Sequence, residues 1–173
     1  MKKVLKYTGV ISLVLSIGAL ILMMATSAVT YTGQVAGYSK TNSIPGVVGI
    51  FGGTEYEYNT PWAGLISWIL LLLAIMILIL GVLIPILKVK GLTKFAGVLN
   101  ICAVCLLLVA GLFMFFEKSA WLAVNGDLSF SAFGGLTSGT YALGVGWIIA
   151  GVVAITSGVF ALLPAVADFL SKK

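Results

Sequence analysis

The sequence contains no histidine and no arginine, and charged residues make up only 9% of its 173 residues. Soluble domains carry about 25% charged residues. Hydrophobic residues make up 61% of this chain, and a small soluble fold has too little interior to hide so much apolar surface. The composition therefore predicts an integral membrane protein that lies among membrane lipids.

The missing residue types exclude several kinds of site. Histidine is the usual protein ligand of haem and a common ligand of zinc, and arginine is the residue that grips phosphate with two parallel hydrogen bonds. No charge falls in the middle of a long apolar run, whereas ionisable groups inside a membrane mark ion and proton paths. We therefore expect no catalytic residue, no cofactor, no metal and no nucleic-acid partner, and we predict that the chain is not an enzyme.

Four apolar runs are each long enough to cross a bilayer, which takes about 20 helical residues. We predict an all-α bundle of four membrane-spanning helices that forms a single domain over residues 1–173. Outer loops rich in Gly, Ser, Thr, Tyr and Asn are expected at 30–61 and 117–140. The predicted spans are residues 4–29, 62–87, 95–116 and 141–166.

The lysines indicate how the chain lies in the membrane. All basic residues are lysines, and only Lys40 and Lys118 fall on the side of the two long outer loops. Because positive charge accumulates on the cytoplasmic side, we expect a protein of the plasma membrane with both termini in the cytoplasm. Glu117, beside Lys118 at the end of the third span, is expected where water reaches it. The lysines on the cytoplasmic side are Lys2, Lys3, Lys6, Lys88, Lys90, Lys94, Lys172 and Lys173.

Three ordered similarities suggest an internal repeat. Positions 6–10 read KYTGV and positions 94–98 read KFAGV, each before a long apolar run. Phe-Gly-Gly occurs before the second span and again before the fourth. A tryptophan is followed by a proline at the same separation in both of these spans. The residues concerned are Phe51–Gly53, Phe133–Gly135, Trp68, Pro85, Trp147 and Pro164.

These similarities predict two parallel helical hairpins, residues 1–90 and 91–173, related by a pseudo-two-fold axis along the membrane normal. The alternative is the shared composition of two apolar segments. The Phe-Gly-Gly pairs are expected to form tight turns, because glycine adopts positive φ angles readily.

Small residues predict where the helices pack. Helices in lipid approach closely where side chains are small, and we assign helix packing to Gly9, Gly97, Ala150, Ala154 and Gly158. The alternative is that some of these residues form a docking face for a partner. We expect the last span to be the most buried, and the second, which is rich in large aliphatic side chains, to be the most exposed to lipid.

The outer loops are expected to form a small β-sheet. Residues 54–59 and 127–133 alternate between polar and apolar side chains, as strands do, and residues 31–38 are a candidate third strand. Tyrosine is favoured at interfaces because one end is apolar and the other is wet. Four loop tyrosines therefore serve either sheet packing or a partner surface, namely Tyr31, Tyr38, Tyr56 and Tyr58.

The layout covers the whole chain: a lysine-led first span, a Gly- and Tyr-rich loop with a Phe-Gly-Gly turn, and a second span that starts at Trp62. It resembles small uncharacterised four-span proteins of low-GC bacteria, a resemblance that implies no activity. It also looks loosely like the claudin group. Trp62 and Gly64-Leu65 lie where the claudin motif W-GLW-C-C would end, but both loop cysteines are missing, so this resemblance implies only a strand cap.

The function that fits best is a non-enzymatic accessory or structural subunit of a larger membrane assembly, which contacts other membrane protein subunits or copies of itself. A first alternative is an oligomeric pore or small-solute carrier lined by polar span residues. A second is a thiol oxidoreductase that uses the C-x-x-C pair, although no second cysteine pair exists to exchange with it. The residues concerned are Ser12, Ser16, Asn100, Thr156 and Ser157 for the pore, and Cys102 and Cys105 for the thiol chemistry.

Overall fold

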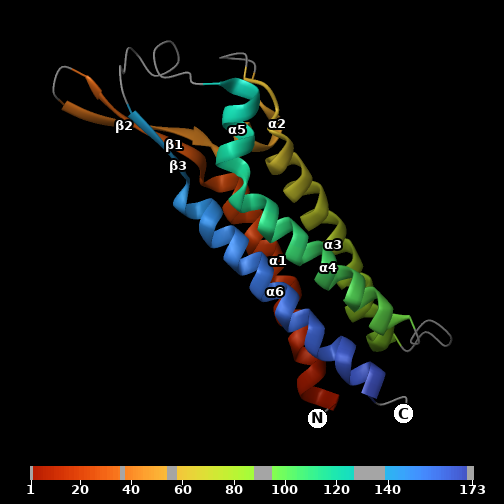
Figure 1. Ribbon diagram of the computed structural model, residues 1–173. Helices are drawn as coiled ribbons and strands as arrows, with labels where there is room; N and C mark the ends of the chain where they lie inside the picture. The colour runs from red at the N-terminus through yellow and green to blue at the C-terminus, as the bar shows by residue number, and fades with distance from the viewer. Residues whose placement is uncertain (1, 36–37, 54–57, 88–94, 127–138, 171–173) are drawn as a thin grey trace.

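The computed structural model describes residues 2–35, 38–53, 58–87, 95–126 and 139–170. The protein is mostly helical. Four long helices form an elongated bundle, and a three-stranded sheet and two short helices lie at one end of it (Figure 1). The first helix begins and the last helix ends at the opposite end of the bundle (Figure 1).

Each of the four long helices contains a segment long and apolar enough to span a membrane. The second has the predicted bounds, and the third is one residue shorter at each end. The first ends earlier than predicted because the chain passes directly into a strand, and the fourth begins later because Tyr141 lies in a strand. The helices are α1 (Lys2–Ala25), α3 (Trp62–Leu87), α4 (Ala96–Phe115) and α6 (Val145–Leu170).

The segments expected to be outer loops contribute to a small sheet, as predicted, but its strands are not the predicted ones. Strands β1 (Ser27–Val35), β2 (Tyr38–Pro45) and β3 (Gly139–Leu143) pair antiparallel in the order β2-β1-β3. Residues 31–38 are therefore not one strand, because they hold the end of β1 and the start of β2. The other two predicted strands lie largely or wholly outside the described residues.

Two short helices complete the sheet end of the bundle. Helix α2 (Gly46–Phe51) is followed by Gly52, whose φ of +75° favours glycine, as expected for a turn at Phe51–Gly53. The matching predicted turn at Phe133–Gly135 lies outside the described residues. Helix α5 (Glu117–Asn125) occupies the start of the segment expected to be a loop.

Paired hydroxyl groups join α1 to α6. The Ser12 and Ser157 hydroxyl oxygens lie 2.9 Å apart. The Ser12 hydroxyl lies 2.8 Å from the Ser157 carbonyl, and the Ser157 hydroxyl lies 2.7 Å from the Ser12 carbonyl. Such interhelical hydrogen bonds contribute about 0.6 kcal/mol each on average in membranes. A similar bond, from the Ser67 hydroxyl to the Ala110 carbonyl at 3.2 Å, joins α3 to α4.

Glycine backbones bring α4 and α6 into direct contact. A Cβ atom added to Gly111 would lie 2.9 Å from the Gly151 carbonyl oxygen, and one added to Gly151 would lie 3.1 Å from the Gly111 carbonyl oxygen. Real Cβ atoms are seldom found this close to other atoms. The two helices therefore cross where neither carries a side chain, as close helix packing in membranes favours.

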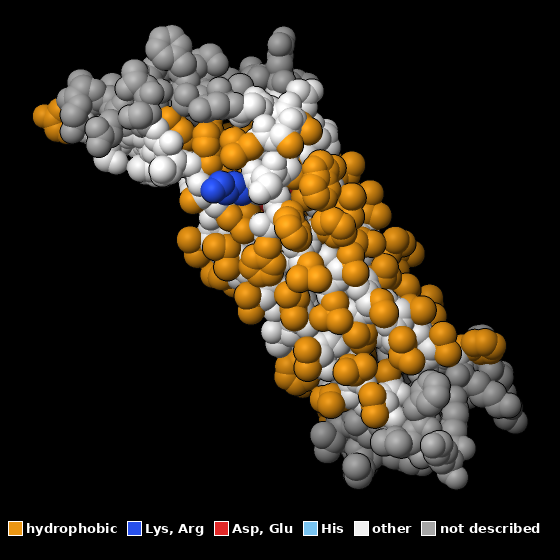
Figure 2. Space-filling view, viewed as in Figure 1, with side chains coloured by type: hydrophobic (Ala, Val, Ile, Leu, Met, Phe, Trp, Pro, Cys, Tyr) orange, Lys and Arg blue, Asp and Glu red, His pale blue; other side chains and the backbone are white. Residues whose placement is uncertain are grey.

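The outside of the bundle is apolar. On the face that Figure 2 shows, hydrophobic side chains cover the helical shaft, and the coloured Lys side chains lie only where the shaft meets the sheet. The buried share of the span residues is 39% for both α4 and α6 and 33% for both α1 and α3. The last span was expected to be the most buried, but α4 is as buried as α6. The second span was expected to be the most exposed, but α1 is as exposed as α3.

The close contact of α4 and α6 predicts opposite results for two identical substitutions. Gly111→Ala should lower the free energy of unfolding by about 1–3 kcal/mol, because the new methyl group overpacks the contact with Gly151. Gly18→Ala on α1 is the matched control, since a Cβ there meets nothing within 4 Å. It should leave stability unchanged or raise it slightly, because alanine favours helix more than glycine does. Thermal unfolding of both variants in detergent measures the difference, and equal melting temperatures would contradict the assigned contact.

Candidate functional site

A carboxyl group lies buried at the sheet end of the bundle. Glu117, the first residue of α5, is 0% exposed, and Ala120 and Trp121 on the same face of α5 are buried with it. The expectation that water reaches Glu117 is wrong. The chain does not leave the bundle as a loop after α4. It continues as a second helix, with the Ala120 N–H bonded to the Phe116 carbonyl at 2.9 Å, and this helix turns Glu117 inward.

Two glycines make room for the carboxyl group. A Cβ added to Gly64 of α3 would lie 3.0 Å from Glu117 Oε2 and would collide with the Gly49 carbonyl oxygen. A Cβ added to Gly49 of α2 would lie 3.4 Å from Glu117 Oε1 and would collide with Ala28 of β1. The carboxyl group therefore lies where α2, α3 and α5 meet, and only glycine fits at positions 49 and 64.

The indole ring of Trp147 forms the wall that α6 contributes. Its ring carbons would lie 3.1 Å from a Cβ at Gly64 and 3.4 Å from a Cβ at Gly49. The ring is fully buried, and its Nε1–H donates a 2.8 Å hydrogen bond to the Met23 carbonyl near the end of α1. This bond holds the ring in place, so the wall of the site is set by the bundle itself.

Burial dominates the electrostatics of this site. Removal from water raises the pKa of the Glu117 carboxyl to about 8, and a backbone contact with Gly64 opposes this shift. The Gly64 contact is not a well-formed hydrogen bond, because neither carboxyl oxygen has a partner of good geometry among the described residues. The raised pKa means that Glu117 is mostly a neutral acid at neutral pH.

Aromatic contacts attach the two short helices around this acid. Trp121 of α5 packs edge-on against Tyr58 with ring centroids 5.0 Å apart, and Phe51 of α2 packs edge-on against Trp68 of α3 at the same distance. In the part of the chain that the structure describes, no three His, Cys, Asp or Glu side chains gather as a metal site would require. A buried carboxyl group such as that of Glu117 can bind and release a proton.

The five residues assigned to helix packing are all buried. Gly9 of α1 faces Val82 of α3, and Gly158 of α6 faces Leu107 and Leu108 of α4. The remaining three lie inside α4 and α6. They are Gly97, Ala150 and Ala154.

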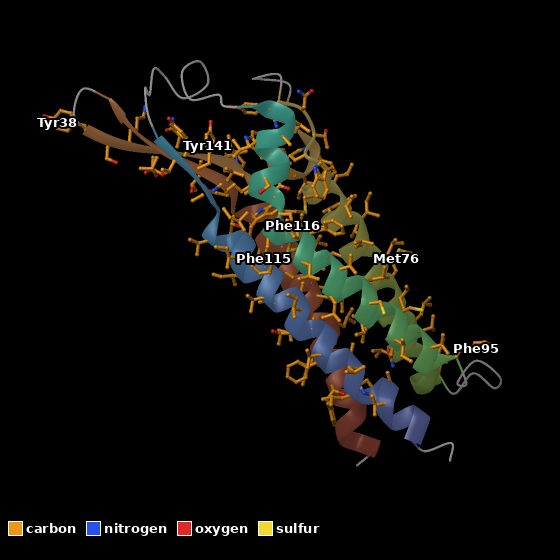
Figure 3. All side chains as sticks on the ribbon, viewed as in Figure 1. Tyr38, Met76, Phe95, Phe115, Phe116 and Tyr141 are labelled. Carbon is orange, nitrogen blue, oxygen red and sulfur yellow. The ribbon has the colours of Figure 1, made fainter. Side chains whose placement is uncertain are left out.

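The loop tyrosines do not share one surface. Tyr31 is buried, and its ring packs at a tilt against that of Tyr141 on the neighbouring strand, with ring centroids 4.7 Å apart. Tyr58 packs against Trp121. Tyr38 is 81% exposed at the outer end of β2 (Figure 3). Tyr56 lies outside the described residues.

The polar residues considered for a pore bond or pack against other helices or bond their own helix. Ser12 bonds Ser157, and the Ser16 hydroxyl donates to the Leu13 carbonyl at 2.8 Å. The exposed Thr156 hydroxyl donates to the Val152 carbonyl of its own helix at 2.8 Å, and Asn100 packs against Gly81. The two cysteines considered for thiol chemistry, Cys102 and Cys105, form no disulfide and lie exposed on α4.

Sequence reasoning missed Glu117 as a buried group. A signal was present, because Glu117, Ala120 and Trp121 have the spacing of one helical face. That spacing places the acid on the same side of a helix as a large aromatic ring.

No protein-family model matches the chain, and no curated protein is similar to it in sequence.

Removing the buried acid should flatten the dependence of stability on pH. An unfolded glutamate loses its proton near pH 4.5, but folded Glu117 keeps its proton up to about pH 8. The protein should therefore lose stability as pH rises through this window, by up to about 1.4 kcal/mol per pH unit. Glu117→Gln, which cannot ionise, should remove this slope and unfold at a higher temperature than the wild type above pH 8.

Thermal unfolding in detergent across the same pH window measures this slope. Lys118→Gln is the control, because it changes the neighbouring charge and should keep the wild-type slope. An identical slope in Glu117→Gln and in the wild type would show that Glu117 does not carry the effect.

Proposed function

We propose that this protein is a non-enzymatic integral membrane protein that acts by contact, as an accessory or structural subunit of a larger membrane assembly. The observation that carries the proposal is the outer sheet, which projects sideways past the helical bundle (Figure 1). Its edge strand β2 is mostly exposed from Tyr38 to Ser43. A projecting strand of this kind gives a neighbouring protein both backbone groups and side chains to contact.

The helical part supports the same role. The serines inside the bundle bond other helices or their own helix, which leaves an apolar shaft that faces lipid or another helix. Large side chains such as Met76 point outward from this shaft (Figure 3). Contact through such a surface needs shape and packing rather than reactive groups.

We further propose that the bundle lies in the plasma membrane with both termini in the cytoplasm and the sheet outside. The distribution of lysines supports this orientation. Helix α1 begins and α6 ends at the end of the bundle opposite the sheet, which is compatible with this orientation (Figure 1).

The internal repeat forms part of this proposal. If residues 1–90 and 91–173 are copies, α1 corresponds to α4 and α3 corresponds to α6. A two-fold axis would then relate the contact of α1 with α6 to the contact of α4 with α3. Both of these contacts are extensive, which supports the repeat, but the axis would also relate α1 with α3 to α4 with α6, and α4 packs much more closely on α6 than α1 does on α3.

Site-specific photocrosslinking in native membranes tests the contact role. A photoreactive amino acid in place of exposed Tyr38 should give a reproducible crosslink to a second polypeptide, which mass spectrometry identifies. The matched control is the same substitution at Tyr31, which is buried against Tyr141 and should react only within the chain.

The same photoreactive amino acid is also placed at exposed Met76. The proposal fails if neither the Tyr38 nor the Met76 variant gives an intermolecular crosslink and the gently extracted protein is a monomer. Solute flux through liposomes that contain the purified chain would instead favour the pore or carrier.

A further inference from the structure

Glu117 is the one acidic side chain that the structure describes, and it is fully buried. The contact role proposed above does not use it. We propose that its carboxyl group is a proton-binding site that fastens an outer cap to the bundle. The outer cap is defined as α2 (Gly46–Phe51) together with α5 (Glu117–Asn125). With the proton bound the cap is seated, and loss of the proton loosens it.

The position of the carboxyl group is the first argument. Glu117 belongs to α5, Gly49 to α2, Gly64 to α3 and Trp147 to α6, and the carboxyl oxygens lie against the glycines while the indole ring lies against the same two glycines. A negative charge in this space would lack both water and a hydrogen-bond partner of good geometry, which is strongly unfavourable. A neutral acid avoids most of this penalty, so the seated cap requires the proton.

The surrounding ionisable groups are the second argument. Helix α2 carries no ionisable residue, and neither does α3. Helix α6 carries only Asp168, at the far end of the bundle. Strand β1 contributes Tyr31, which packs against Tyr141 of β3. Helix α5 contributes Lys118, the residue next to Glu117, and the segment before α3 contributes Tyr58, whose ring packs against Trp121 of α5. Lys118 is the one cation among these groups, and it is partly exposed on a different face of α5 from the buried residues. The raised pKa of Glu117 agrees with an environment that offers no compensating charge.

The far end of α5 explains what the release of the proton would move. Asn125 accepts a 2.7 Å hydrogen bond from the Asn59 N–H, and its amide donates to the Asn59 carbonyl at 3.1 Å. The Asn59 amide also donates to the Val124 carbonyl at 3.2 Å. These bonds do not involve Glu117, so the end of α5 near Asn125 should stay attached when the end near Glu117 loosens.

The outer sheet is connected to both parts of the cap. Helix α5 contacts β1 and β3, and α2 follows β2 directly after Pro45. Loosening the cap therefore changes how firmly the sheet is held on the bundle. The proton site would then regulate the projecting strand, whether or not that strand binds a partner.

Hydrogen–deuterium exchange of the full chain in lipid nanodiscs tests the proposal, with rates corrected for the intrinsic effect of pH. As pH rises through about 8, wild-type protection should fall at least tenfold in α2 and in the first turns of α5. The shaft helices α3 and α4 and the end of α5 near Asn125 should keep their protection. Glu117→Gln, which stays neutral, should show no such transition, and the same transition in this variant would overturn the proposal.

Infrared spectroscopy of the wild type keeps the test decisive if Glu117→Gln does not fold. The carbonyl stretching band of a protonated carboxylic acid should be present at neutral pH and disappear through about pH 8, in step with the loss of protection. Absence of the band at neutral pH would overturn the proposal. Sodium or calcium ions are added above this pH as a further arm. Recovery of protection with either ion would show that the site takes a metal cation rather than a proton.

Discussion

Lipid offers no hydrogen bonds to a polar group, so partners for the polar groups within the bundle must come from the protein. This constraint explains why the helix contacts are made from small residues. Ser12 and Ser157 bond each other's carbonyl groups across α1 and α6, and Gly111 and Gly151 let α4 and α6 touch at their backbones. Helix α6 is therefore held on two sides, and many large side chains, such as Met76, are exposed on the surface of the bundle.

Length and hydropathy predict the four long helices well, because both are properties of a continuous segment. Helix α3 has the predicted bounds. A small sheet was predicted correctly, but its strands were assigned to the wrong residues. Strand β1 pairs with β3, and Tyr31 lies opposite Tyr141 although the two residues are far apart in the sequence. Local alternation of polar and apolar residues cannot reveal such pairing, since the partner strand decides which segment becomes extended.

The candidate site was less predictable than the fold. The burial of Glu117 depends on Gly49, Gly64 and Trp147, which belong to three other elements. Because Glu117 follows the end of an apolar run, its position in the sequence suggests a carboxylate exposed to water. The bundle and the outer cap meet at this acid, so a membrane protein whose shaft has little chemistry contains a titratable group at the base of its projecting sheet.

The contact between α1 and α6 offers the most direct test of the bundle. Cysteines at positions 12 and 157, in a chain whose Cys102 and Cys105 are replaced by alanine, would occupy the two hydroxyl positions that lie 2.9 Å apart. Oxidation in membranes should join them in nearly every molecule, because the distance suits a disulfide after small adjustments. Cysteines at positions 12 and 156 are the control, since Thr156 is exposed on the outside of α6. Equal crosslinking of the two pairs, or none for positions 12 and 157, would contradict the packing of the bundle.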